Sequence, residues 1–260
     1  MKTEQTEVLL QDSPGVKTKD IVIEITHLTK SFGTKEVLKD FSLKLYKGEN
    51  LVVLGKSGSG KSVLIKCIVG LLRADAGIIK VFDRDVTTLT GREMDEMRRD
   101  IGFLFQSGAL YDSMTVKQNL EFPLRRIGGH LTQKEIDTKI EEALENVGLL
   151  DALDKMPSQL SGGMRKRISL ARTIVVDPKI ILYDEPTTGL DPVTSDEISL
   201  LINDVQKKYK ASSIIITHDI ECARMTANRL IMLQDGEAYK EGNLSQFEKS
   251  TDSVIKFFFK

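Results

Sequence analysis

The sequence predicts an α/β fold, in which short apolar strands form a buried sheet and amphipathic helices cover it. An apolar run at residues 51–54 leads into a glycine-rich loop and then into a helical pattern. Apolar runs at residues 101–105, 180–182 and 214–216 are each followed by polar side chains, as is typical of buried parallel strands. Residues 107–160 show helical periods instead of strand patterns, which indicates an inserted all-helical part.

The composition bounds the class of protein. The 260 residues are 40% hydrophobic, enough for one large domain or a domain with a subdomain, and the net charge of −1 gives no overall attraction to nucleic acid or anionic lipid. No apolar run approaches the ~18 residues of a membrane helix, and the start of the chain lacks the apolar stretch of a signal peptide. We therefore expect a cytosolic protein that meets a membrane only through a protein partner. Cys67 and Cys222 have no metal or redox spacing and are expected to be buried thiols.

The chain begins with a polar segment, residues 1–19, that is predicted to be a mobile tail. Alternating patterns at residues 21–25 and 41–45 predict two strands. Phe32 and Gly33 are expected in a turn between them. The Phe32 ring is of the kind that stacks on an adenine base, and a plain hydrophobic contact is the alternative.

Residues 55–62 read GKSGSGKS and fit the phosphate-loop pattern G-x-x-x-x-G-K-[ST] between the predicted strand and helix. Small residues let the backbone wrap phosphate groups, and the free N–H groups and dipole of the following helix face the anion. Lys61 is expected to reach the β and γ phosphates, and the Ser62 hydroxyl to ligate Mg²⁺. The residues expected to bind the nucleotide here are Gly55, Lys56, Ser57, Gly58, Ser59, Gly60, Lys61, Ser62 and Val63.

Polar residues follow three of the predicted strands, at the edge where α/β sheets bind ligands. Gln106 either meets a ligand there or faces water. Asp184 is placed to hold Mg²⁺, and Glu185 to orient or deprotonate a water; an acid pair at a helix N-terminus is the alternative, which Pro186 disfavours. His218 follows the strand at residues 214–216 and is expected at the same edge.

The inserted helical part carries clear boundaries. Thr132 and Glu135 form a capping box, and Gly148 is expected to cap the end of that helix. The insertion ends at LSGGM, residues 160–164, before a basic amphipathic helix. A second anion site is expected at the N-terminus of that helix, at Ser161, Gly162 and Gly163.

The basic triplet Arg165, Lys166 and Arg167 suggests either phosphate binding or a solvated helix face, and the second is the commoner explanation. Further on, Asp235-Gly236 predicts a hairpin turn. Residues 245–260 are expected to form one or two short helices.

Together these motifs resemble the ATP-binding cassette ATPases of ABC transporters, over about residues 20–243. GKSGSGKS is similar to the Walker A motif, LSGGM to the ABC signature, IILYDE to the Walker B motif with its glutamate, and TGLD, which ends at Asp191, to the D-loop. Gln106, His218 and Phe32 match the Q-loop, the H-loop and the adenine-stacking position. The resemblance implies a P-loop NTPase cassette with a RecA-like core, an antiparallel β subdomain, a helical subdomain at about residues 107–164 and a short C-terminal helical extension at residues 244–260.

The resemblance also implies an activity and a dimer. ATP would be hydrolysed at Mg²⁺, with Glu185, His218, Gln106 and Lys61 as catalytic residues and Ser62, Gln106 and Asp184 around the metal. In this family two cassettes pair head to tail, and the signature of one encloses the ATP on the phosphate loop of the other. That arrangement explains two anion sites in one chain and implies a homodimer. Phe32, the signature residues and Asp191 would then contact the nucleotide.

Within the family, residues 105–125 and LSGGMRKR resemble the ATPase of the Mla-type, Mce-associated phospholipid transport systems, because Met164 and Arg165 stand where the commoner signature has glutamine. This implies an integral-membrane permease, an Mce-type lipid-binding protein, phospholipid as cargo for outer-membrane asymmetry, and a place on the cytoplasmic side of the inner membrane. Leu110 and Tyr111 are expected to touch the permease, with local packing as the alternative. The other hypotheses are an importer ATPase for amino acids or similar small solutes, and a soluble cassette protein without a permease.

Overall fold

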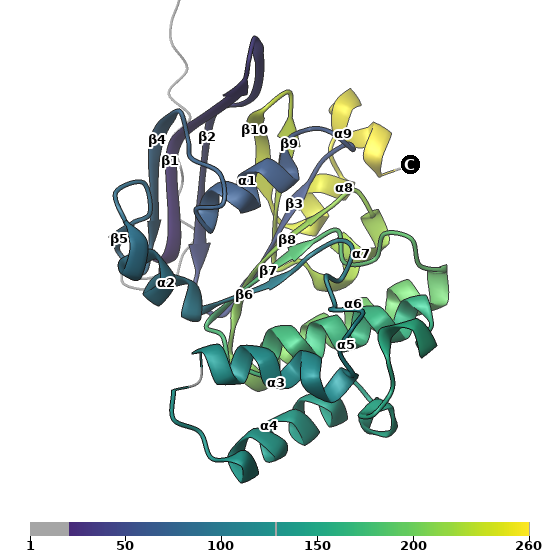
Figure 1. The fold of residues 1–260 in the computed structure, drawn as a ribbon. Helices are drawn as coiled ribbons and strands as arrows, with labels where there is room; N and C mark the ends of the chain where they lie inside the picture. The colour runs from purple at the N-terminus through teal and green to yellow at the C-terminus, as the bar shows by residue number, and fades with distance from the viewer. Residues whose placement is uncertain (1–20, 128, 260) are drawn as a thin grey trace, which may run out of the picture.

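The computed structural model describes residues 21–127 and 129–259, so the tail expected at residues 1–19 lies outside the described part. Figure 1 shows two β-sheets with helices between them and on one side. The smaller sheet has four strands in the order β2-β1-β4-β5. Its strands are antiparallel neighbours; they are β1 (Ile21–Phe32), β2 (Lys35–Tyr46), β4 (Ala76–Val81) and β5 (Arg84–Asp85). Phe32 is the last residue of β1 and not part of the turn as expected, because pairing with Lys35 extends the hairpin to Gly33 and Thr34.

The larger sheet is mixed and has six strands in the order β10-β9-β3-β8-β7-β6. Five of them run parallel, and only β10 is antiparallel to its neighbour. The strands are β3 (Asn50–Leu54), β6 (Ile101–Leu104), β7 (Ile180–Asp184), β8 (Ser212–Thr217), β9 (Arg229–Gln234) and β10 (Glu237–Gly242). Parallel pairing brings the ends of β3, β6, β7 and β8 to one edge, as the sequence predicted.

Side chains of the larger sheet alternate between two hydrophobic cores. Leu51 and Val53 of β3 point into a core shared with the smaller sheet, whereas Val52 and Leu54 point into a core shared with the helices. Helix α1 (Lys61–Ile68) lies between the two sheets, so the phosphate loop before it is held by both (Figure 1). Helix α2 (Gly91–Arg99) adds Met97 to the same core.

Helices α3 to α6, which belong to the second core, lie in the lower half of Figure 1. Helices α5 (Gly162–Ile174), α6 (Pro192–Tyr209) and α7 (Ile220–Thr226) contribute to the core with the sheet, and α3 (Val116–Ile127) and α4 (Gln133–Asn146) pack beyond α5. Helix α4 begins with the predicted capping box at Thr132 and Glu135. Gly148 follows its end with a φ of 68°, a left-handed conformation that suits glycine. No strand occurs among the described residues between 107 and 164.

The remaining predictions on the fold agree with the structure. Asp235 and Gly236 both have positive φ, as a two-residue type I′ hairpin requires. The chain ends in two short helices, α8 (Leu244–Glu248) and α9 (Ser253–Phe258). Cys67 and Cys222 are buried free thiols, and burial raises the pKa of each to about 11. No helix within the described ranges has the length and apolar character needed to cross a membrane.

Candidate nucleotide-binding site

Two glycines of the phosphate loop lie too close to their surroundings for any side chain. A Cβ on Gly55 would lie 2.7 Å from the Leu233 carbonyl oxygen. Gly60 has a φ of 106°, and a Cβ there would lie 2.9 Å from the Val37 carbonyl oxygen. The two fixed glycines of the motif therefore let the loop pass close to strands of both sheets before α1 begins.

Lys61 is the first residue of α1 and its side chain is only 4% exposed. Its ammonium donates to the carbonyl oxygens of Gly55 at 2.7 Å and Lys56 at 2.9 Å. It also lies 3.1 Å from Glu185 Oε1. The lysine is thus folded back across its own loop and ion-paired with the acid that follows β7, which explains how its charge is tolerated in a buried position.

Glu185 is 7% exposed and has a φ of 50°, which turns the chain sharply after β7. While Oε1 is paired with Lys61, Oε2 lies 2.8 Å from Nδ1 of His218 and accepts from the Thr188 hydroxyl at 3.2 Å. Both carboxylate oxygens are therefore engaged by groups from three different segments. The structure brings Lys61, Glu185 and His218 together, as the sequence predicted for that edge of the sheet.

Ser62 and Asp184 provide two oxygen donors beside this network. The Ser62 hydroxyl donates to Asp184 Oδ1 at 2.9 Å, and Asp184 is 6% exposed. Burial raises the pKa of Asp184, an effect that the Ser62 hydrogen bond opposes and the neighbouring Glu185 charge adds to. A bound cation would offset that cost. Hydroxyl and carboxylate oxygens suit Mg²⁺, which commonly takes one or two carboxylates together with substrate phosphates. A site of this kind needs no cluster of three acids or histidines, and the described residues contain none.

A hollow of about 480 Å³ lies over the phosphate loop. Ten of the predicted residues line it: Phe32, Ser57, Gly58, Gly60, Lys61, Ser62, Val63, Gln106, Glu185 and His218. Phe32 is 48% exposed at its edge, and the Lys30 ammonium lies 5.4 Å from the ring centroid. Lys35, Val37 and Thr188 also line the hollow and were not predicted as site residues. Lys35 and Val37 line the hollow because the β1–β2 hairpin lies close to the phosphate loop. No local sequence pattern predicts that packing.

Four predicted residues adjoin the hollow without lining it. The carbonyl oxygens of Gly55 and Lys56 hold Lys61, and Asp184 lies behind Ser62. The Ser59 hydroxyl is buried and has no hydrogen-bond partner among the described residues.

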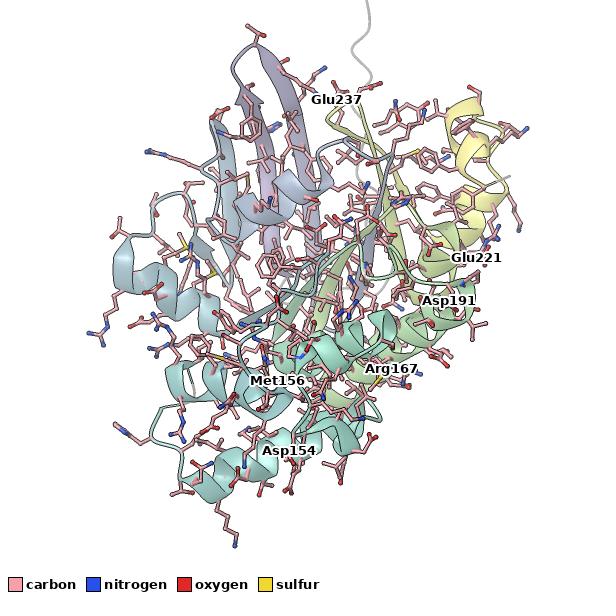
Figure 2. The ribbon with its side chains drawn as sticks, turned by 45° about the vertical axis from the view of Figure 1, so that its right-hand side comes forward. Asp154, Met156, Arg167, Asp191, Glu221 and Glu237 are labelled. Carbon is pink, nitrogen blue, oxygen red and sulfur yellow. The ribbon has the colours of Figure 1, made fainter. Side chains whose placement is uncertain are left out.

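The signature residues and Asp191 lie outside the hollow of their own chain. Ser161 caps α5, where its hydroxyl accepts from the Met164 N–H at 3.2 Å. Gly162 and Gly163 form the first turn of that helix. Asp191 caps α6 by accepting from the Thr194 N–H at 3.0 Å and its hydroxyl at 2.6 Å, on the right of Figure 2. The structure therefore explains Ser161 and Asp191 as helix caps and brings neither them nor the two glycines to the Lys61 network.

The expectation that the basic triplet forms a solvated helix face is wrong for its middle member. Arg165 donates to the Leu160 carbonyl, and Arg167 pairs with Glu197 on α6. Lys166 is only 5% exposed, and its ammonium donates to the Gln106 carbonyl oxygen at 2.7 Å and the Glu185 carbonyl oxygen at 3.4 Å. Helical periodicity places it on the face of α5 that packs against these loops. Burial lowers the pKa of Lys166 to about 8, against the opposing influence of Asp184 and Glu185.

Comparisons with known proteins agree with this geometry. Residues 38–188, more than half of the chain, match the family model for the ABC transporter. The probable ribonucleotide transport ATP-binding protein mkl of Mycobacterium leprae is 43% identical over 92% of this chain and 68% of its own length. The methionine import ATP-binding protein MetN 2 of Rhodopseudomonas palustris is 40% identical over 86% of this chain and 59% of its own length.

Solved structures give the same answer for the fold. The dimeric post-hydrolysis structure of the ATP-binding cassette MJ0796, bound to ADP and phosphate, superposes with a TM-score of 0.78 at 32% identity, over 85% of this chain and 98% of that one. The cbiO1 protein of Clostridium perfringens, part of the cbiONQ transporter complex, gives 0.81 at 28% identity, over 91% and 94%. The chain belongs to the ABC transporter family, as an ATP-binding cassette that binds ATP with Mg²⁺ and hydrolyses it.

Proposed function

We propose that two copies of this chain enclose two ATP molecules between them and use ATP hydrolysis to drive a membrane permease. The observation that carries this proposal is the division of the site. The phosphate loop and Glu185 line the hollow of one chain, with Asp184 behind Ser62, whereas Ser161 and the two glycines after it lie outside that hollow. Ser161 and Gly162 are exposed at the start of α5. A second copy would supply the missing side, as the dimeric form of the related cassette MJ0796 suggests.

In each site we propose the following roles. Lys61, Gln106 and His218 surround the γ-phosphate, and Glu185 accepts a proton from the attacking water. Ser62 and Asp184, with the Gln106 side chain, would hold Mg²⁺, and the bound ion would supply positive charge against the phosphates. In the structure Lys61 neutralises Glu185 Oε1, so an entering γ-phosphate competes for the same ammonium. Transfer of Lys61 to the phosphate frees one oxygen of Glu185 to act on water.

Dimer formation tests the central claim. Glu185→Gln keeps the shape of the side chain and removes the basic carboxylate, so the protein should form a dimer with ATP and Mg²⁺ that does not disassemble. Size-exclusion chromatography with light scattering measures it. Wild-type protein with ADP is the matched control and should remain monomeric. Glu185→Gln protein that binds ATP and stays monomeric would contradict the shared site.

We propose phospholipid as the cargo, because residues 105–125 and the signature with Met164 and Arg165 resemble those of Mla-type lipid transporters. The surface in question is centred on Tyr111, whose ring is 40% exposed and lies 4.8 Å from the Arg172 guanidinium and 5.2 Å from the Phe122 ring. Asn119, which is buried, accepts from the Tyr111 N–H at 2.8 Å and donates to its carbonyl at 3.1 Å. The ring is thus presented by a rigid loop, as a contact for a permease should be.

Leu110, the other residue expected to touch the permease, is half-buried and packs against the helical core. A charge at residue 110 would disturb the cassette itself, so Tyr111→Asp is the sharper variant. It should lose the permease in a detergent pull-down and keep its affinity for ATP. Leu200→Asp, at an exposed apolar residue of α6, is the control.

An importer for small solutes is the second candidate, and the names of the relatives favour it, since they are named for ribonucleotide transport and methionine import. The two candidates differ in the phenotype of a deletion strain. A lipid transporter on the cytoplasmic side of the inner membrane, with an Mce-type partner, predicts a weakened detergent barrier and normal methionine uptake. A normal barrier with lost methionine uptake would decide for the importer. The purified complex should also contain glycerophospholipid if lipid is the cargo.

A further inference from the structure

A second buried lysine, besides Lys61, contacts the site, and it comes from the signature helix. Lys166 of α5 has its ammonium 2.7 Å from the Gln106 carbonyl oxygen and 3.4 Å from the Glu185 carbonyl oxygen. Gln106 follows β6 and Glu185 follows β7, so one cation joins the two loops at the edge of the sheet. Neither the phosphate loop nor the signature motif assigns a function to this residue.

The groups around the Lys166 ammonium compensate the cost of burying its charge. A buried ammonium is costly unless hydrogen bonds and opposite charge compensate it. Here the hydrogen bonds go to two backbone carbonyls, and the carboxylates of Asp184 and Glu185 supply the opposite charge nearby. The side chain is 5% exposed, so water does not substitute for either partner. The contact to the two carbonyls therefore defines the spacing between the loops.

The position of Lys166 along α5 links its contacts with the two loops to the signature residues at the start of the same helix. Ser161 caps the helix and Lys166 follows it by five residues, a rise of about 7.5 Å along a helix. The same helix lies against the Gln106 loop further along, where a Cβ on Gly108 would lie 2.6 Å from the Ser169 hydroxyl. Because α5 moves as a rigid body, a displacement of its N-terminus should therefore also displace both loops.

We propose that Lys166 is a positioning residue that ties Gln106 and Glu185 to the signature helix of their own chain. The proposal rests on the proposed dimer, in which the start of α5 docks on the nucleotide of the partner. Docking at one site then sets the position of Gln106 and Glu185 in the other. Lys166 would thus couple the two ATP sites, in addition to holding its own site in order.

Three variants separate charge from packing. Lys166→Met removes the ammonium and keeps the chain length, Lys166→Gln keeps a donor without the charge, and Lys166→Arg keeps the charge. Arg167→Met is the matched control, because it removes a neighbouring charge of the same helix that pairs with Glu197 and does not line the hollow. The full chain is assayed for steady-state phosphate release against ATP concentration, and for its melting temperature.

We expect Lys166→Met to lower kcat by about 10- to 100-fold, because small displacements of catalytic groups have effects of this size. The KM for ATP should stay within about twofold of wild type, since Lys166 does not line the hollow, and the Hill coefficient for ATP should fall toward one. Lys166→Arg should restore most of kcat and of the cooperativity, Lys166→Gln should restore little, and Arg167→Met should behave as wild type.

A purely structural role has a different result. Lys166→Met with a lowered melting temperature but wild-type kcat and Hill coefficient would overturn the proposal. If the methionine variant does not fold, equal kcat for Lys166→Gln and Lys166→Arg overturns it instead. Failure of the proposed function is recognised separately, by wild-type protein that hydrolyses ATP without cooperativity and whose Glu185→Gln variant does not dimerise.

Discussion

The phosphate loop and the signature segment are both glycine-containing helix starts, yet they are held in different ways. At the phosphate loop, Lys61 pairs with Glu185, and Glu185 pairs in turn with His218, so three distant segments converge. At the signature, Ser161 makes a single local cap to Met164, three residues along. The phosphate-loop region is held by long-range contacts, such as Ser62 to Asp184 over 122 positions and Glu185 to His218 over 33, whereas the start of α5 is satisfied by its own helix.

The comparison indicates which of the two regions is still available to an anion. Charged groups at the phosphate loop already neutralise one another, so a nucleotide entering there must exchange partners with Lys61. The first turn of α5 contains no acidic side chain that could accept hydrogen bonds from the N–H groups at the start of the helix. An anion brought by another chain would be received without displacing anything.

The largest effect is expected in the region where Lys61, Glu185 and His218 meet, which we call the convergent region. Glu185→Gln removes the proton acceptor, and general-base catalysis contributes about 10²- to 10⁴-fold, so kcat should fall by that factor while ATP binding remains. Steady-state phosphate release and fluorescent-nucleotide binding measure the two. Glu197→Gln, an acid on α6 that pairs with Arg167, is the control and should keep wild-type turnover. Phosphate release near wild type in Glu185→Gln would remove Glu185 from the mechanism.

The signature should respond across chains, and the choice of glycine decides whether this is visible. A Cβ on Gly163 would lie 2.6 Å from Thr194 Cγ2 of the same chain, so Gly163→Asp also disturbs the packing of α5 on α6. At Gly162 the nearest such atom is Leu190 Cδ2 at 3.9 Å, and Gly162→Asp should fold normally. It should nevertheless prevent ATP-dependent dimer formation, because an added negative charge meets the phosphates of the partner site.

Mixing two variant chains tests more directly whether the signature acts across the dimer. A dimer of one Lys61→Ala chain and one Gly162→Asp chain has one composite site intact and one damaged twice, whereas each parent dimer has damage in both sites. We expect mixed protein to recover part of the ATP-driven dimerisation that both parents lack, measured by light scattering. Mixed protein no better than its parents would show that the signature acts within its own chain.

The sequence predicted the convergent region well because its residues lie at strand ends, and parallel pairing brings strand ends to one edge. Gln106, Glu185 and His218 follow β6, β7 and β8 for this reason. It failed where a side chain owes its environment to the packing of a helix on a loop. Lys166 belongs to a run of three basic residues, and charge alone does not tell which member faces inward. Val37 lines the hollow through the lean of a hairpin, which no local pattern encodes.

A smaller effect is expected at Phe32, on the rim of the convergent region. Stacking of a base on an aromatic ring contributes about 1–3 kcal/mol, so Phe32→Ala should weaken ATP binding by about 5- to 150-fold. The affinity for inorganic triphosphate should be unchanged, since that ligand has no base to stack on the ring. Isothermal titration with ATP and with inorganic triphosphate measures both. Equal loss for the two ligands would mean that Phe32 supports the phosphate loop and does not hold the base.

The smallest effect, at Asp191, separates a cap from a contact across the dimer. Hydrogen bonds from the Thr194 hydroxyl and N–H hold the pKa of Asp191 below its ordinary value of 3.8. A carboxylate with a lowered folded-state pKa stabilises the fold above its unfolded pKa, and that stability is lost as the pH falls through the folded value. Asp191→Ala should therefore melt a few degrees lower than wild type at pH 7, and the difference should shrink toward pH 3.

Asp191→Asn is the informative partner of that variant, because the amide oxygen still accepts from Thr194 while the charge is gone. If Asp191 only caps α6, Asp191→Asn should keep both the melting temperature at pH 7 and the ATPase rate of wild type. If it also acts on the partner's site, as its place in the TGLD motif implies, the melting temperature should stay and the ATPase rate should fall. We expect the second result, since the carboxylate is exposed at the start of α6, whose first turn lies against Gly163 of the signature through Thr194. An unchanged rate in Asp191→Asn would leave the cap as its whole role and confine the cross-chain contacts to the start of α5.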